Sequence, residues 1–195
     1  MIRSLSSKDA LQIAKLHHNS FPNFFLTSLG KKFLTVFYKS VLDSADGYGI
    51  GIFENNNLLG FAIGTTKPNG FYKRIAKKNF LPLSIAAIPS FVSHPKKVIQ
   101  LIQSLRSQNY SIDDDTGVLL SICTLSESQN KGLGSKVINA FEEITKQKKL
   151  QNLALTTDFE KNEAANKFYQ KKSYILKEHF YTRNGRKMNL YIKKL

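Results

Sequence analysis

Apolar residues between Ala10 and Leu42 recur with the period of a helix, which predicts two amphipathic helices after a short first strand. The first helix begins at Ser6 and Asp9, which have the spacing of a capping box. Its inward face carries Ala10, Ile13, Ala14 and His17. The second helix is predicted from about Leu29 to Leu42, with an inward face of Phe33, Val36, Phe37 and Val41. A histidine on such an apolar face is more often a core residue than a catalyst, and we interpret His17 first in that way.

The period changes to two at Tyr48, and this alternation predicts an antiparallel hairpin. Its strands are marked by Tyr48, Ile50 and Ile52 and then by Leu59, Phe61 and Ile63, on either side of an Asn55-Asn56-Asn57 turn. Glycines are unusually frequent in and beside these strands, at positions 47, 49, 51, 60 and 64. They predict a bulge or a close approach of another backbone.

Residues 68–112 have the weakest pattern in the chain. Short helical pieces interrupted by Pro82 and Pro89 are predicted first, followed by a helix from about Lys96 to Leu105. Because no repeat or low-complexity linker flanks this region, we expect one domain over residues 1–195, with residues 68–112 as a helical insertion.

The stretch from Gly117 to Ser135 joins an apolar strand, a polar loop with two glycines and the start of a helix. That helix has an inward face of Leu133, Val137, Ile138, Phe141 and Ile144. A strand with Leu153, Leu155 and Thr157 follows, and then a helix over 162–172. The chain is expected to close with a hairpin whose strands span about 174–182 and 187–192 around Asn184-Gly185.

Composition narrows the class of protein. The single cysteine excludes an internal disulfide and is typical of a reducing compartment, and no run is long enough to cross a membrane, so we expect a cytoplasmic protein. The net charge of +15 favours anionic ligands such as nucleotides, coenzyme A, nucleic acid or an acidic membrane, although the lysines are dispersed. Asp113-Asp114-Asp115 is interpreted as a solvated loop, because no further ligands are spaced to complete a metal site.

Two motifs carry the chemistry. The first is Gln129-Asn130-Lys131-Gly132-Leu133-Gly134, a glycine loop that opens a helix and can hold a phosphate on free backbone amides. It lacks the Gly-Lys-Ser/Thr ending of a Walker A loop and the third glycine of a dinucleotide fingerprint. The second is Asn162-Glu163-Ala164-Ala165-Asn166-Lys167-Phe168-Tyr169, which begins shortly after the next strand.

In this order and at this separation, the two motifs resemble those of the GNAT N-acetyltransferase superfamily, in which a Gln/Arg-x-x-Gly-x-Gly/Ala loop precedes Asn-x-x-Ala-x-x-Φ-Tyr. The motifs cover residues 117–174, and the upstream helices and hairpin follow the family's order. The resemblance implies an α/β (α+β) fold with a mixed, mostly antiparallel central sheet flanked by helices, and a helical insertion before the fourth strand. It also implies acetyl-CoA as the acetyl donor.

By this resemblance, cofactor-binding groups come from the fourth strand, the loop and the helix that follow it, and the start of the last helix: Ile122, Cys123, Thr124, Gln129, Asn130, Lys131, Gly132, Leu133, Gly134, Ser135, Asn162 and Ala165. Tyr169 would be the general acid that protonates the leaving thiolate. Two positions depart from the family pattern. No proline precedes the loop, and Ser173-Tyr174 replaces the Gly-Phe that ends the tyrosine helix. Cys123 is interpreted as a core residue and not as a nucleophile.

The general base is open, because the fifth strand offers Thr156 and Thr157 where peptide-acetylating members can have glutamate. The candidates are Glu54, Asp158, Glu160, His17 and a water held by Ser121. The expected reaction is direct transfer of an acetyl group to a primary amine. The arrangement of residues 29–42, residues 68–112 and Met188-Asn189 is similar to that of GNAT members whose acceptors are amino sugars on nucleotide carriers.

Three alternatives stay open. One is acetylation of a peptide, a protein or another small amine, although a chain of net charge +15 repels polyamines. Another is a non-catalytic GNAT scaffold that binds nucleic acid. The third is an enzyme that touches anionic lipid through Lys73, Arg74, Lys77 and Lys78 beside Phe71 and Phe80. The sequence leaves the acceptor and the oligomeric state undetermined.

Overall fold

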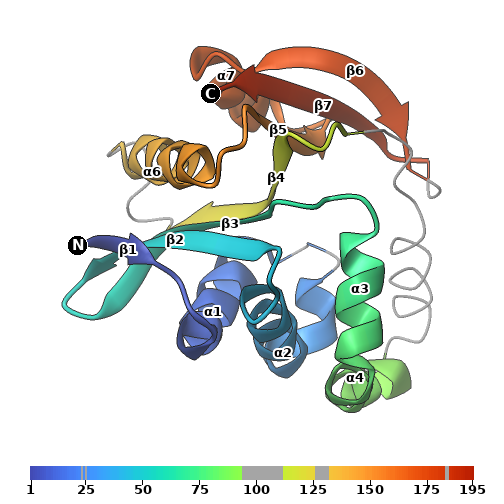
Figure 1. The fold of residues 1–195 in the computed structure, drawn as a ribbon. Helices are drawn as coiled ribbons and strands as arrows, with labels where there is room; N and C mark the ends of the chain where they lie inside the picture. Colours follow the sequence, from blue (N-terminus) through green and yellow to red (C-terminus); the bar gives the residue numbers. More distant parts are fainter. Residues whose placement is uncertain (23, 25, 94–111, 126–131, 183–184) are drawn as a thin grey trace.

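Seven strands form one sheet in the order β1-β2-β3-β4-β5-β7-β6 (Figure 1). The computed structural model describes residues 1–22, 24, 26–93, 112–125, 132–182 and 185–195. The strands are β1 Ile2–Ser4, β2 Gly47–Glu54, β3 Asn57–Thr65, β4 Thr116–Thr124, β5 Asn152–Asp158, β6 Ile175–Tyr181 and β7 Lys187–Lys194. Within this sheet β4 and β5 are parallel and the other neighbouring pairs are antiparallel. The predicted mixed, mostly antiparallel sheet is confirmed.

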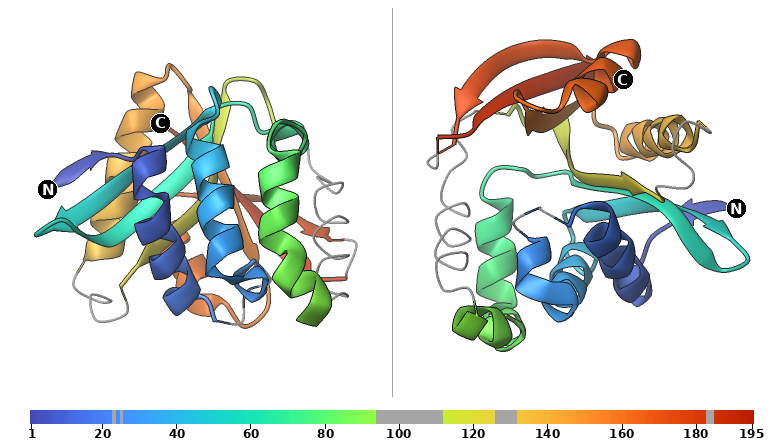
Figure 2. Two further views of the ribbon diagram at one scale, coloured as in Figure 1. Left: turned by 90° about the horizontal axis from the view of Figure 1, so that it is seen from below. Right: turned by 180° about the vertical axis from the view of Figure 1, so that it is seen from behind.

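Helices cover both faces of the sheet. They are α1 Ala10–Ser20, α2 Gly30–Leu42, α3 Phe71–Lys78, α4 Phe80–Ser93, α6 Leu133–Gln147 and α7 Glu163–Lys171, with short 3-10 turns at Ser7–Asp9 and Thr27–Leu29. Figures 1 and 2 show α1 to α4 on one side of β1 to β4, with α6 on the other side. The strands β6 and β7 and the helix α7 lie at the far end of the molecule from α4.

The alternation along the strands divides the core into two clusters. Phe61 and Ile63 pack with α1 and α2, whereas Ala62 between them packs with α6. The inward faces predicted for α1 and α6 are confirmed by the burial of Ile13 and Phe141. In α2, however, the predicted inward residues Val36 and Phe37 are only half-buried, and Leu34 and Tyr38 are buried in addition to Phe33 and Val41. The apolar pattern alone had not marked Tyr38.

The predicted bulge is confirmed on the β3–β4 pair. Ile63 pairs with Ser121 but Gly64 pairs with Leu119, so Leu120 is the extra residue on β4. A Cβ atom at Gly64 would lie 2.5 Å from the Val118 carbonyl oxygen and 2.5 Å from the Phe141 ring. Because real side chains do not approach backbone so closely, glycine is required where α6 crosses the bulged strand.

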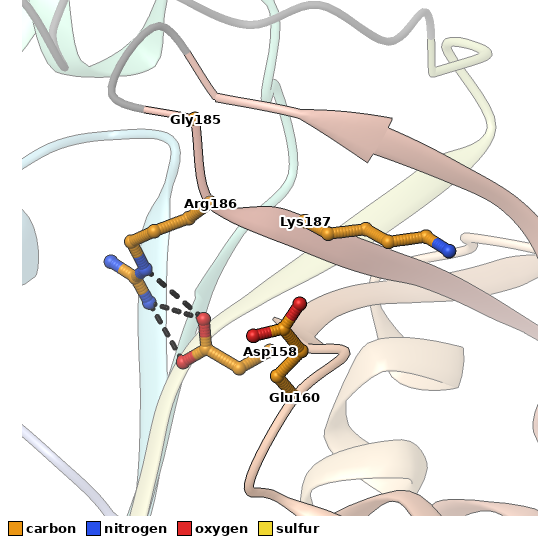
Figure 3. A pocket seen from close by; sticks show the side chains of 5 residues that line it. All are labelled: Asp158, Glu160, Gly185, Arg186 and Lys187. Carbon is orange, nitrogen blue, oxygen red and sulfur yellow. Dashed lines mark hydrogen bonds and ion pairs between the residues drawn. The ribbon is translucent and has the colours of Figure 1, made fainter.

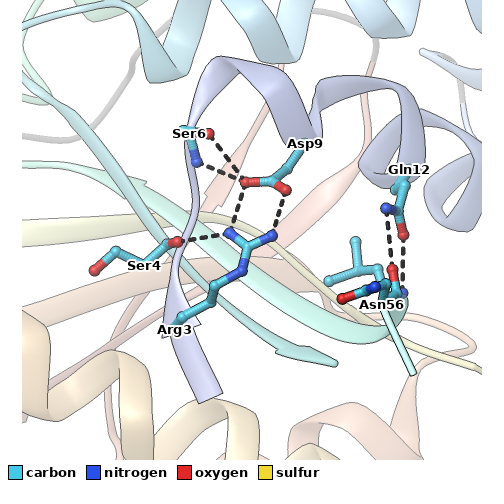
Figure 4. Close-up of polar contacts among 7 residues, drawn as sticks. Arg3, Ser4, Ser6, Asp9, Gln12 and Asn56 are labelled. Atoms are coloured by element: carbon cyan, nitrogen blue, oxygen red, sulfur yellow. Dashed lines mark hydrogen bonds and ion pairs between the residues drawn. The ribbon is translucent and has the colours of Figure 1, made fainter. Parts of the chain in front are cut away.

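Polar contacts fix the N-terminal segment on the sheet (Figure 4). Asp9 accepts hydrogen bonds from the Ser6 backbone at 2.9 Å and from both terminal nitrogens of Arg3, so the predicted capping box is confirmed. The Arg3 hydrogen bond and the nearby positive charge hold the pKa of Asp9 below its ordinary value. Gln12 bonds the Asn56 carbonyl and the Leu58 N–H, which ties α1 to the β2–β3 turn.

The region before β4 contains two helices, as expected, but prolines do not interrupt α4. Pro82 lies in its first turn, where the N–H has no helical partner, and the helix continues through Pro89 with one backbone bond fewer. Four large apolar side chains of α4 are more than half exposed: Phe80, Leu81, Ile85 and Ile88. The predicted helix over 96–105 lies outside the described residues. No helix in the described part of the chain is long and apolar enough to span a membrane.

Candidate active site

The strands β4 and β5 separate near the middle of the sheet. Their pairing runs from Thr116–Asn152 to Leu119–Leu155, while β4 continues to Thr124 along β3. The separation begins beside the bulge at Leu120, because the extra residue bends the strand. Beyond this point the edge of β4 that faced β5 has backbone groups available to a ligand. Figure 1 shows β4 and β5 diverging between the two halves of the sheet.

The helix α6 begins beside this separation with an open N-terminus. Gly132 is its N-cap in the left-handed conformation, φ +74°, and no side chain caps the helix. Among the described residues, a Cβ atom at Gly132 would have nothing within 4 Å, and one at Gly134 would meet only the Phe168 ring at 3.8 Å. The first-turn amides of Leu133, Gly134 and Ser135 have no intrahelical partners, and the helix dipole there favours an anion. Gln129, Asn130 and Lys131 lie outside the described residues.

The last residues of β4 have different environments. Ile122 is half-buried on the α6 side of the sheet. The Cys123 side chain is buried on the opposite side, with its sulfur 3.8 Å from the Leu16 carbonyl oxygen. Burial raises the pKa of Cys123 to about 11, so the group is a thiol at neutral pH, in agreement with its interpretation as a core residue. The Thr124 carbonyl accepts a hydrogen bond from the Ser20 hydroxyl at 3.4 Å.

Asparagines anchor the start of α7 to the end of β5. The Asn162 amide donates to the Thr157 hydroxyl oxygen. The Asn166 amide donates to the carbonyls of Asp158 and Asn162 and accepts a hydrogen bond from Asn189 at 2.7 Å. Asn162 therefore holds β5, while Ala165 is half-buried among the side chains between α6 and α7.

Tyr169 projects from α7 into the same cluster. It is 7% exposed, and its ring lies against those of Phe168, Tyr174 and Tyr191. Its hydroxyl makes no hydrogen bond to the described residues. The oxygen is nevertheless not one of the fully buried oxygens, so part of its surface stays accessible and it is not fully enclosed by the described residues. Burial raises the pKa of Tyr169 to about 12, which keeps the phenol protonated at physiological pH.

The carboxylate candidates for the base are unfavourably placed. Both oxygens of Asp158 accept bonds from Arg186, at 2.6 and 2.7 Å (Figure 3). Glu160 is exposed and lines, with Asp158, Gly185, Arg186 and Lys187, a surface depression of about 210 Å³. Glu54 is exposed at the turn between β2 and β3, two strands away from β5. Both Asp158 oxygens are therefore already paired, although its side chain is 40% exposed.

The remaining candidates, His17 and Ser121, are connected. The His17 Nδ1 atom lies 2.7 Å from the Tyr38 hydroxyl oxygen, which lies 3.1 Å from the Ser121 Oγ atom. His17 and Tyr38 are 2% and 1% exposed, whereas Ser121 is half-buried. Burial, and secondly the charge of neighbouring His18, lower the pKa of His17 to about 4. The sequence did not indicate a polar role for Tyr38, because an aromatic residue at helical spacing is typical of a hydrophobic core. It also did not indicate the contact between Asn166 and Asn189.

Comparisons with known proteins agree with this architecture. Residues 11–174 match the model of the acetyltransferase (GNAT) family. A comparison with curated protein sequences gives no match. Among solved structures, the chain aligns over its full length with aminoglycoside 6'-acetyltransferase type Ii at 12% identity, covering 96% of that chain with a TM-score of 0.65.

Two further solved structures also align with the whole chain. One is the ribosomal-protein-S18-alanine N-acetyltransferase from Escherichia coli, with 12% identity, 92% of that chain and a TM-score of 0.62. The other is the PaiA N-acetyltransferase from Thermoplasma acidophilum in complex with coenzyme A, with 14% identity, 98% of that chain and a TM-score of 0.58. At such low sequence identities these structures show only that the fold is similar. The assignment of the chain to a family rests on the match to the family model. The protein belongs to the GNAT family of acetyltransferases, enzymes whose acetyl donor is acetyl-CoA.

Proposed function

We propose that this enzyme transfers the acetyl group of acetyl-CoA to the primary amine of an amino sugar carried on a nucleotide, with Tyr169 as the general acid. The observation that carries the proposal is the Tyr169 hydroxyl. It belongs to a buried tyrosine with a pKa raised to about 12, and it makes no hydrogen bond to the described residues. Because of this pKa, the phenol stays protonated at neutral pH and can donate its proton to the thiolate that forms as the C–S bond breaks.

The described residues fit an acetyl-CoA molecule that spans from α6 to the separation of β4 and β5. The first-turn amides of Leu133, Gly134 and Ser135 would hold the pyrophosphate, since no described atom lies within 4 Å of a Cβ built at Gly132. Backbone groups of Ile122, Cys123 and Thr124 would bind the pantetheine arm, as the outer edge of β4 no longer pairs with β5. Asn162 would act indirectly, by holding β5 through Thr157.

In the reaction, the neutral amine attacks the thioester carbon, a C–N bond forms and the C–S bond breaks. A backbone N–H of β4 beside the bulge would stabilise the negative charge that develops on the carbonyl oxygen. The amine nitrogen loses one proton to a base, which passes it to solvent. Tyr169 gives its proton to the sulfur as the thiolate leaves, and solvent returns a proton to the phenolate. The products are an amide and free coenzyme A.

Charge favours a nucleotide-linked amino sugar as the acceptor. The net charge of +15 attracts a diphosphate and repels polyamines. The depression beside the β6–β7 turn offers Glu160 for sugar hydroxyls and Lys187 for phosphate, whereas Asp158 and Arg186 are paired with each other. One solved structure of similar fold is an aminoglycoside acetyltransferase, and aminoglycosides are amino-sugar compounds. Another is a ribosomal-protein-alanine acetyltransferase, so a protein amine is the second candidate.

An acceptor panel tests the proposal. Acetyl-CoA consumption is measured with a nucleotide-linked amino sugar, a peptide with a free N-terminus, and spermidine. We expect the nucleotide-linked amino sugar to have the highest kcat/KM. A peptide with the highest kcat/KM would replace it with the second candidate. Failure to consume acetyl-CoA with every amine, together with salt-sensitive retention of nucleic acid, would indicate a binding protein and contradict the proposal.

A further inference from the structure

A chain of three polar side chains runs through the core from α1 to the separation of β4 and β5. It connects His17 on α1, Tyr38 on α2 and Ser121 on β4, with contacts of 2.7 and 3.1 Å. Ser121 lies two residues beyond Leu119, the last residue of β4 that pairs with β5. It is also next to Ile122, where the backbone becomes available to the acetyl donor. The chain therefore leads from the interior to the reacting end of the proposed site.

This chain differs from another buried tyrosine contact in the same protein. The Tyr48 hydroxyl lies 2.8 Å from the Thr145 hydroxyl, which donates to the Phe141 carbonyl within α6. That contact begins and ends inside the protein. The His17 chain instead begins at a buried Nε2 atom that has no hydrogen-bond partner in the described part of the chain, and it ends at a half-buried hydroxyl. Burying an unpaired nitrogen is unfavourable, and such exceptions in a core call for an explanation.

The three groups can carry a proton in either direction. In the structure the Tyr38 hydroxyl donates to the Ser121 oxygen. Rotation of both hydroxyls, with His17 in its other tautomer, gives the reverse arrangement, in which Ser121 donates to Tyr38, Tyr38 donates to Nδ1 and the Ser121 oxygen is free to accept a hydrogen bond from a ligand. If His17 donates to Tyr38 and Tyr38 donates to Ser121, the Ser121 proton is free to be donated. Each hydroxyl has one donor and two lone pairs, so neither arrangement leaves the chain broken.

We propose that Ser121 is the binding site of the acceptor's neutral primary amine, and that Tyr38 and His17 orient Ser121 and receive the proton that the amine loses. This inference rests on the proposed acetyltransferase function and assigns its missing base. Ser121 would contact the substrate, whereas Tyr38 and His17 act through it as positioning residues. The site takes an uncharged amine, because no carboxylate lies in the chain.

The proton transfer balances without another reactant. As the amine nitrogen bonds to the acetyl carbon, its proton moves to the Ser121 oxygen. The Ser121 proton moves to Tyr38, and the Tyr38 proton moves to Nδ1 of His17. On the other side of the reacting carbon, Tyr169 protonates the sulfur. The chain resets when the proton on His17 returns through Tyr38 and Ser121 to solvent in the emptied site, and Tyr169 regains a proton.

The surroundings of His17 favour this return. Its ring lies against Phe21, Phe24 and Tyr38, and the ionisable neighbours of His17 and Tyr38 are His18, Tyr72 and Cys123. None of these groups is an anion at neutral pH that could retain a proton on His17. With a pKa of about 4, His17 is neutral between turnovers at physiological pH, so it can accept a proton from the next amine.

Single substitutions test the inference in the full-length protein. Kinetics are measured with acetyl-CoA and the best acceptor of the three-amine panel, for Ser121→Ala, Tyr38→Phe and Tyr48→Phe. Tyr38→Phe and Tyr48→Phe each remove one buried hydroxyl, so Tyr48→Phe controls for the loss of a core hydrogen bond. We expect kcat to fall ~10²-fold in Ser121→Ala and Tyr38→Phe, as for loss of a general base, and to stay within about twofold in Tyr48→Phe. Affinity for acetyl-CoA should be unchanged in all three.

The pH profile and rescue by added base separate proton transfer from structural support. In Tyr38→Phe, kcat should rise with pH and with added imidazole, because an external base replaces the chain, while wild type responds to neither. If Ser121→Ala and Tyr38→Phe behave like Tyr48→Phe, the amine site is wrong although the acetyltransferase function stands. If wild type neither binds acetyl-CoA nor acetylates any of the three amines, the proposed function fails and this inference fails with it.

Discussion

Tyr174 donates its backbone N–H to the carbonyl oxygen of Tyr169 at 3.0 Å, and the two rings meet edge-on with their centroids 5.6 Å apart. This bond closes the C-terminus of α7 in the manner of a Schellman cap. The backbone reverses at Ser173, which has φ +64°, a conformation that glycine adopts without steric cost. The cap therefore helps to fix the Tyr169 ring, but it does so with a serine where the family usually has glycine.

Ser173→Gly should stabilise the protein by about 0.5–1 kcal/mol, because the left-handed conformation is strained for residues with a Cβ atom. For a chain of 195 residues this corresponds to a rise in Tm of roughly 1–4 °C. Thermal unfolding followed by circular dichroism measures the shift. Ser173→Ala is the control, since it removes the hydroxyl but keeps Cβ, and it should not stabilise. An equal gain in both variants would show that strain at Ser173 is not the cause.

Tyr169→Phe should lower kcat by ~10²-fold or more with little change in the affinity for acetyl-CoA, since it removes the proposed general acid and keeps the ring in place. Tyr174→Phe is a matched control from the same aromatic cluster and should retain activity. Turnover by thiol release and affinity by calorimetry give the two quantities separately. Full activity of Tyr169→Phe would exclude the tyrosine from the mechanism.

Elements with a strong local period could be predicted from the sequence. The alternation of Phe61 and Ile63 predicts β3, and the spacing of Val137 and Phe141 predicts α6, because each pattern is set by one face of one element. The sequence could not show that Tyr38 connects His17 to Ser121. These residues come from three separated segments, and a tyrosine at helical spacing has the pattern of an ordinary core residue.

The solvent exposure of individual side chains also could not be predicted from the sequence. The spacing of Ile85 and Ile88 indicates a helix, but burial depends on what packs against it, and both side chains are more than half exposed. The sequence identifies the functional motifs but not the contacts that their side chains make in the fold. Thus the spacing of Asn162 and Tyr169 identifies the motif, whereas the bond of Asn162 to Thr157 and the packing of Tyr169 against Tyr174 and Tyr191 depend on the tertiary structure.

Gly134→Asp should abolish the rise in Tm that acetyl-CoA produces in the wild type. A carboxylate in the first turn of α6 would place bulk and negative charge where the pyrophosphate is expected. The change should be tolerated by the fold, since a Cβ at this position meets only the Phe168 ring at 3.8 Å. Asn139→Asp adds the same charge on the exposed face of the same helix and should retain the shift. An undiminished shift in Gly134→Asp would contradict the assignment of the α6 N-terminus.

Protonation of His17 should make the protein less stable as pH falls from about 6.5 to about 4. The pKa of His17 is lowered to about 4 from 6.5, so in this range the unfolded state binds a proton that the folded state does not. The contribution is fully present above pH 6.5, declines through the interval, and is constant below pH 4. A difference of this size corresponds to roughly 3 kcal/mol over the whole range.

Urea unfolding at several pH values measures this effect, and His17→Gln should remove most of the slope between pH 6.5 and 4. His18→Gln substitutes the adjacent, half-buried histidine and should keep the slope. Asp9, whose pKa is lowered by Arg3, loses its contribution as pH falls below its ordinary value of 3.8, so it acts mainly outside this window. An unchanged slope in His17→Gln would mean that the imidazole accepts a proton in the folded protein as readily as in the unfolded chain. The neutral resting state required of the His17–Tyr38–Ser121 chain would then be lost at mildly acidic pH.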